Sequence, residues 1–164
     1  MLKNLVIAVE LTNRQTTLPP DEPRLAEAVR RVLAGEGIAR AEVSVALVDD
    51  REMRELNRQF LAHDYATDVL SFVLEATAER LEGEIVVSAD TAVAAAEKYG
   101  WPAEDELLLY VVHGALHLAG WDDAGEEQAA TMRRRERHYL ASFGLLPPAA
   151  EEALLAGGGG SSKP

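Results

Sequence analysis

The alternation of apolar and polar residues divides this chain into short strands separated by helices. Val43, Val45 and Leu47 alternate with Ser44 and Ala46, which predicts a strand with one buried face. Further apolar runs predict strands at residues 5–9, 69–72 and 84–88. These four strands are enough for one small sheet.

Apolar residues spaced three or four positions apart predict helices between and after the strands. One begins at Pro23 and ends before Gly35, one carries Met53, Leu56 and Phe60 on one face, one runs from about Ala89 to Tyr99, one follows Pro102, and the last spans about residues 125–142. Because helices and strands intermix without a regular βαβ repeat, the predicted fold class is α+β with a small mixed β-sheet.

The helix after Pro102 is predicted to be the buried centre of the fold. It is apolar nearly all round, through Leu107, Leu108, Val111, Val112, Leu116 and Leu118. His113 and His117 lie four positions apart, so both imidazoles project from one face about one turn apart. Two buried imidazoles on one face need a shared partner, and a metal ion is one.

A carboxylate follows this histidine pair closely. Gly120 is predicted to end the helix, and Asp122 and Asp123 come directly after Trp121, so the chain can fold back and offer an oxygen to the same ion. Two histidines and one carboxylate would leave an open coordination position, as in catalytic zinc sites. The alternative is that each ring is simply hydrogen-bonded within the core.

Composition limits the remaining possibilities. The chain of 164 residues is predicted to form a single domain over residues 1–146, followed by a flexible tail rich in Pro, Gly and Ser over residues 147–164. It has no cysteine, so a metal must be held by His, Asp or Glu. No apolar run is long enough for a signal peptide or a membrane span, so we expect a cytoplasmic protein with no membrane partner.

The charge of the chain argues against a generic nucleic-acid binder. The formal net charge is -12, and residues 41–100 hold 5 Lys and Arg against 13 Asp and Glu. A polyanionic substrate would therefore have to be bound by a local patch around the metal rather than by the field of the whole molecule.

Basic residues and further histidines supply other candidates. Arg51, Arg54 and Arg58 form a stripe on the second predicted helix, and Arg58 is our candidate for contacting substrate. The alternative is that Glu52 and Glu55 pair with these arginines on an exposed face. A run of arginines at residues 133–137, beside His138, is interpreted as a solvated helix C-terminus, and His63 as a loop residue.

Three separated motifs resemble segments of one known family. Residues 113–123, HGALHLAGWDD, are similar to the signature HGxLHLxGYDH. Leu56-Asn57 with Asp64 and residues 67–72, TDVLSF, is similar to a second segment of that family, and residues 83–88, GEIVVS, to a third. Over roughly residues 43–140 the chain thus resembles the YbeY family of bacterial metal-dependent endoribonucleases.

The resemblance implies both a site and a function. It implies that His113, His117 and Asp123 bind one Zn²⁺ per chain, with another divalent metal possible because one ligand is an aspartate. It also implies a cytoplasmic enzyme that cleaves single-stranded RNA, matures the 3′ end of 16S rRNA on the small ribosomal subunit and takes part in ribosome quality control. The catalytic base is not identified by the motifs.

Two positions depart from the family pattern. Asp123 stands where the family has a third histidine, and Leu61 stands where it has an arginine. An anionic ligand acidifies bound water less than a neutral imidazole does, and leucine cannot contact phosphate, so we expect attenuated activity. Leu61 favours a second reading, a non-catalytic ribosome-assembly factor that retains a structural metal.

A metallopeptidase is the less favoured alternative. The i, i+4, i+10 spacing of His113, His117 and Asp123 matches that of the extended zinc-protease motif. That motif has a catalytic glutamate beside its first histidine, where this chain has Gly114.

Overall fold

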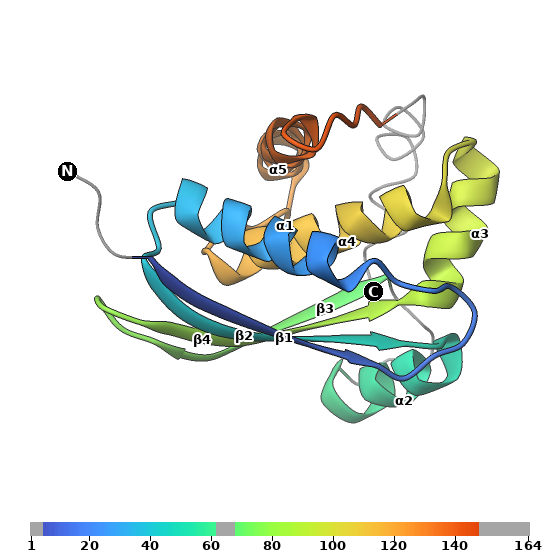
Figure 1. The fold of residues 1–164 in the computed structure, drawn as a ribbon, viewed down its shortest axis with the longest axis horizontal. Coiled ribbons are helices and arrows are strands. Elements are labelled where there is room, and N and C mark those ends of the chain that lie inside the picture. Colours follow the sequence, from blue (N-terminus) through green and yellow to red (C-terminus); the bar gives the residue numbers. More distant parts are fainter. Residues whose placement is uncertain (1–4, 62–67, 148–164) are drawn as a thin grey trace.

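The fold is a four-stranded mixed sheet with helices packed mainly on one face (Figure 1). The computed structural model describes residues 5–61 and 68–147. The elements follow one another as β1 Val6–Asn13, α1 Glu22–Gly35, β2 Arg40–Val48, α2 Asp50–Leu61, β3 Val69–Ala76, β4 Leu81–Ser88, α3 Ala89–Tyr99, α4 Ala103–Leu118 and α5 Glu126–Ala141. The predicted α+β class is confirmed.

The sheet has the order β1-β2-β4-β3. β1, β2 and β4 are parallel, and β3 is antiparallel to β4, so the predicted mixed sheet is also confirmed. β3 and β4 are longer than predicted because they form a hairpin closed by residues 77–80, where the amide of Thr77 donates to the carbonyl of Arg80 at 2.9 Å. Cross-strand pairing thus extends both strands toward the turn.

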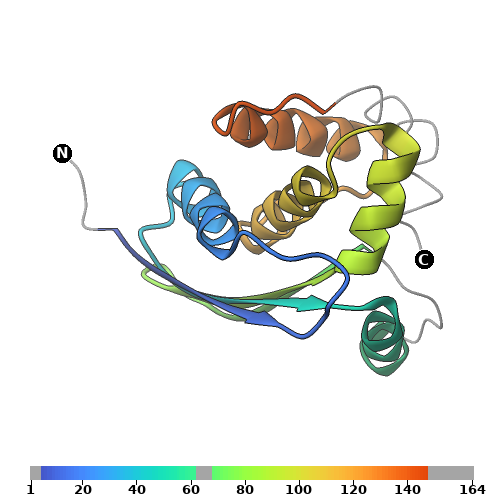
Figure 2. The same ribbon diagram turned by 45° about the vertical axis from the view of Figure 1, so that its right-hand side comes forward.

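α4 is the central helix of the molecule. It contacts α1 and α3 on its flanks, α5 above it and strands β3 and β4 below it (Figure 2). Its residues 106–112 are all buried, as the all-round apolar pattern predicts. The main core lies between this helix, α1 and the alternating inner residues of β2, which are Ala41, Val43, Val45 and Leu47.

Local sequence signals set the helix ends. The side chain of Asp21 accepts from the amide of Arg24 at 3.2 Å and caps α1, and Ser88 caps α3 by accepting from Thr91 at 3.1 Å. Gly100 ends α3 with a φ of +82°, a conformation that glycine adopts without strain.

Within the described residues no helix is both long and apolar enough to cross a membrane.

The opposite face of the sheet is covered at one end by α2 (Figure 1). Met53 packs there with Val48, Leu70 and Val86. Phe60 lies on the same face of this helix as Met53 and Leu56, as predicted. It is not buried there, because it is 57% exposed. It borders a cavity of about 450 Å³ on the sheet face that α2 leaves open.

Candidate metal centre

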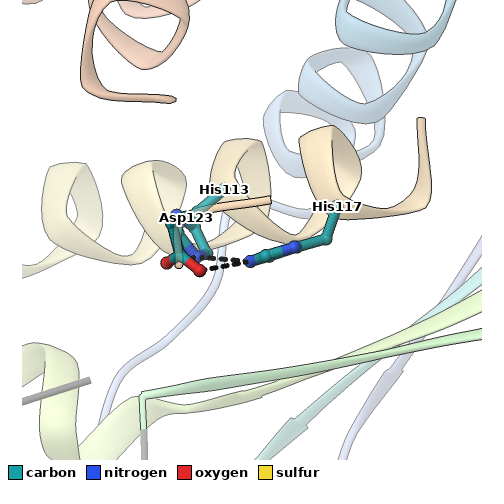
Figure 3. Close-up of side chains that lie close together, drawn as sticks. All are labelled: His113, His117 and Asp123. Carbon is teal, nitrogen blue, oxygen red and sulfur yellow. Dashed lines mark hydrogen bonds and ion pairs between the residues drawn. The ribbon is translucent and has the colours of Figure 1, made fainter. Parts of the chain in front are cut away.

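α4 brings His113 and His117 together on one face, where both are half-buried. Their Nε2 atoms lie 3.1 Å apart, and the two rings meet edge to face (Figure 3). The spacing of four residues places the side chains about one helical turn apart on the same side. The sequence prediction that this pair shares one face is therefore confirmed.

Gly114 lets α4 approach the sheet closely beside this pair. A Cβ at this position would lie 2.7 Å from Cγ2 of Ile85 in β4, closer than real contacts allow. Ser71 of β3 donates a hydrogen bond to the carbonyl of Gly114 at 3.2 Å. These contacts fix the height of the histidine pair above the sheet.

The chain reverses direction at the end of α4 through a hydrogen-bonded glycine turn. The amide of Gly120 donates to the carbonyl of His117 and the amide of Trp121 to that of Leu116, both at 3.0 Å, which is the Schellman pattern. Gly120 has a φ of +108°, as that turn requires. The turn directs Asp123 back toward the two histidines.

Asp123 completes a group of three donors, as Figure 3 shows. Its Oδ2 lies 3.5 Å from Nε2 of His113, and its Oδ1 lies 3.7 Å from Nε2 of His117. Ligands bound tetrahedrally at about 2.0–2.2 Å from one ion lie roughly 3.3–3.6 Å from each other. The donor set and its spacing therefore fit a small divalent ion.

Glu136 of α5 holds the first histidine in place. Its Oε2 accepts a hydrogen bond from Nδ1 of His113 at 2.5 Å, and the residue is buried. Burial by itself lowers the pKa of His113, but this bond and the negative charges of Glu136, Asp68 and Asp123 outweigh it and raise the pKa to about 9. A metal-binding histidine commonly donates its second nitrogen to a carboxylate in this way.

The second histidine lies beside the turn, and its Nε2 is directed at the other two donors. Burial and the charge of His113 lower the pKa of His117, which favours the neutral form that metal binding needs.

Further buried acidic residues lie near this group. Glu106 is 2% exposed and accepts from Nε1 of Trp101 at 2.6 Å, and burial raises its pKa. Burial also raises the pKa of Asp68, which the charge of His113 partly offsets. The charges of Glu136, Asp68 and Asp123 favour a positive charge at His113, so this side of the site favours a cation.

The sequence analysis does not predict a role for Glu136. It interprets the arginine run as solvated, but Glu136 is buried and Arg135 pairs with Glu36 at 3.1 Å. The available signal is the single acidic residue within RRRER. Asp68 belongs to one of the family motifs, which gives it no role.

The remaining predicted residues lie apart from the three donors. Arg58 is exposed and pairs with Glu55, the alternative considered from the sequence. His138 is exposed and packs edge-on against Tyr139. Leu61 is the last residue of α2, and His63 lies outside the described residues, as does the predicted tail from residue 148 onward.

Comparison with known proteins shows the family. A protein-family model described as Endoribonuclease YbeY matches residues 10–144, which include all three donors. The chain belongs to the YbeY family. The family resemblance of the three motifs is therefore confirmed.

Relatives named Endoribonuclease YbeY support this assignment. The protein from Rhodopirellula baltica is 46% identical over 105 residues, which are 63% of this chain and 54% of that protein. The one from Nautilia profundicola is 48% identical over 91 residues, 54% of this chain and 66% of that protein. The chain thus matches just over half the length of the first relative. The protein from Chlorobium phaeobacteroides is 37% identical over 121 residues, 74% of this chain and 86% of its own length.

A solved structure is also similar. The solution structure of TM1509 from Thermotoga maritima superposes with a TM-score of 0.55 at 26% identity. The match covers 82% of this chain and 91% of that one. The α+β fold is thus shared with an experimentally determined structure.

Proposed function

We propose that this protein is a metal-dependent endoribonuclease that cleaves single-stranded RNA. The observation that carries the proposal is the convergence of His113, His117 and Asp123 within 4.8 Å of one another, in a chain of the YbeY family. Three protein donors leave a coordination position open, and an open position is characteristic of catalytic rather than structural zinc sites.

The proposed cofactor is one Zn²⁺ per chain, bound by those three side chains. Two imidazoles suit zinc, whereas the aspartate also suits harder divalent ions, so another metal can substitute. A bound divalent ion would lower the pKa of a coordinated water and polarise a phosphoryl oxygen of the substrate. Glu136 would orient the imidazole of His113 so that its Nε2 faces the ion.

RNA binding requires cationic side chains in an acidic protein. We propose that Arg58 contacts a substrate phosphate. It would release its ion-pair partner Glu55 to do so. An exposed pair of this kind contributes little stability, so the exchange costs little. Binding should weaken as salt rises, since phosphate contacts release counterions.

We further propose that the substrate is the rRNA of the small ribosomal subunit, matured at the 3′ end of 16S rRNA, and that the protein serves ribosome quality control in the cytoplasm. This part of the proposal is supported by membership of the YbeY family. The partner would then be the small subunit or its precursor particle.

Leu61 supports a second candidate, a non-catalytic ribosome-assembly factor with the same metal.

A metallopeptidase is not supported by the residues beside the metal ligands. The position of its catalytic glutamate is occupied by Gly114, where even a Cβ would overlap Ile85. A glutamate there would displace Ile85 or move α4 away from the sheet.

One experiment separates these candidates. Metal-loaded protein is incubated with single-stranded rRNA and, separately, with a peptide library, using His117→Ala as the control. We expect slow RNA cleavage that is lost in His117→Ala and no peptide cleavage. RNA cleavage equal in the two proteins would favour the assembly factor, and peptide cleavage that depends on His117 would favour a peptidase.

A further inference from the structure

Trp121 lies between helix α4, which carries His113 and His117, and Asp123. It follows Gly120 in the turn after α4 and precedes Asp123 by two residues. Its amide donates to the carbonyl of Leu116, and the amide of the preceding Gly120 donates to the carbonyl of His117. The position of this one residue therefore affects both the end of α4 that carries His117 and the segment that carries Asp123.

The Trp121 side chain is held by residues of α1 and α5. Its Nε1 donates to Oε1 of Glu36 at 2.8 Å, and the Arg135 guanidinium lies 4.7 Å from the centre of its ring. Arg135 also donates to Oε1 of Glu36 at 3.1 Å, and the Tyr139 hydroxyl donates to Oε2 at 2.5 Å. We name Glu36, Trp121, Arg135 and Tyr139 the Trp121 clamp.

Glu36 is the centre of the clamp. Its side chain is only 7% exposed and receives hydrogen bonds from three other residues. Burial by itself raises the pKa of Glu36, but the bonds from Tyr139 and Trp121 and the charge of Arg135 outweigh it and lower the pKa. A buried carboxylate with three donors holds its partners far more firmly than an exposed ion pair does.

The rest of the turn has little to hold it. Asp122, Ala124 and Gly125 are exposed, and the amide of Asp123 bonds only locally, to Oδ1 of Asp122 at 2.8 Å. Fixing the backbone of a mobile turn costs conformational entropy. If the turn were not already ordered, metal binding would have to bear that cost at Asp123.

We propose that Glu36 and Arg135 are positioning residues of the metal centre, which raise its affinity for a divalent ion by holding Trp121 and thereby ordering Asp123 and His117. The proposal rests on the metal site of the proposed function. Neither residue contacts the three donors directly, and both act through Trp121. The clamp joins the ends of α1 and α5 to a site built on α4.

The test compares Glu36→Gln with Asp105→Asn. Both variants change a largely buried carboxylate, paired with an arginine of another helix, into an amide. Asp105 pairs with Arg24 at 2.7 Å, and its side chain is 13% exposed. Affinity for Co²⁺ is measured by competition with a chelator, the geometry of the site by the visible absorption of bound Co²⁺, and the stability of the metal-free protein by thermal unfolding.

Glu36→Gln is expected to lower the melting temperature of the metal-free protein about as much as Asp105→Asn does. It is expected to weaken Co²⁺ binding at least about tenfold and change the Co²⁺ spectrum, whereas Asp105→Asn should leave both unchanged. Trp121→Phe, which keeps a ring for Arg135 but lacks the indole N–H, should weaken binding in the same direction and carries the test if Glu36→Gln does not fold.

Wild-type affinity and spectrum in the folded clamp variants would overturn the proposal, as would an equal loss of affinity in Asp105→Asn. Wild-type protein that binds no Co²⁺ would contradict the clamp and the metal site together. Wild-type protein that binds Co²⁺ tightly but cleaves no RNA would contradict only the proposed function.

Discussion

Nδ1 of His113 donates to the buried carboxylate of Glu136 at 2.5 Å, which links the first proposed metal ligand of α4 to helix α5. Because this bond engages Nδ1, Nε2 is the nitrogen that faces His117 and Asp123. The orientation of the site therefore depends on a residue 23 positions away in the sequence.

Glu136→Gln should weaken metal binding by about tenfold to a hundredfold, because a carboxylate behind a histidine ligand both orients the ring and strengthens it as a donor. The affinity is measured by competition with a chelator. Glu126→Gln, in the exposed first turn of α5, is the matched control. Equal affinities in the two variants would show that the Glu136 bond does not matter for binding.

The two neighbouring aspartates should differ sharply. Asp123→Ala should abolish tight metal binding, since its oxygens lie 3.5 and 3.7 Å from the two imidazoles, whereas exposed Asp122 only accepts from the Asp123 amide. Asp123→His should retain binding and favour zinc more strongly. Metal titration of the three variants decides the assignment, and a larger loss in Asp122→Ala would reverse it.

Much of this site could be predicted from the sequence because its signals are local. The i, i+4 histidines, the glycine turn and the following aspartates act within a single helix end. Glu136 and Glu36 could not be found that way, since each is defined by packing between helices distant in the chain. Phe60 shows the same limit for the fold, because helical periodicity gives the direction of a side chain but not what covers it.

Acid should selectively remove the contribution of Glu36 to stability. The pKa of Glu36 is lowered in the folded state, so its contribution is present above its unfolded pKa and is lost as pH falls through the lower folded value. The difference in melting temperature between metal-free wild type and Glu36→Gln should therefore shrink as pH falls below the ordinary pKa of a glutamate, about 4.3. A difference that stays constant in this acid range would contradict the ionised state of Glu36.

Leu61→Arg should raise RNA cleavage by at least roughly tenfold, because an arginine can position phosphate oxygens and stabilise the charge that builds on them. The gain should lie in turnover more than in binding. Leu61→Lys, which restores charge without the planar fork, should gain less. If Leu61→Arg folds, binds metal and RNA and cleaves no faster than wild type, leucine at this position is not what limits the rate.

Elemental analysis of purified protein shows whether His113, His117 and Asp123 form a metal centre. We expect about one divalent ion per chain for the wild type and far less for His113→Ala, with a lower melting temperature after the metal is removed. Less than about a tenth of an ion per chain, together with a melting temperature that added Zn²⁺ or Ni²⁺ leaves unchanged, would contradict it.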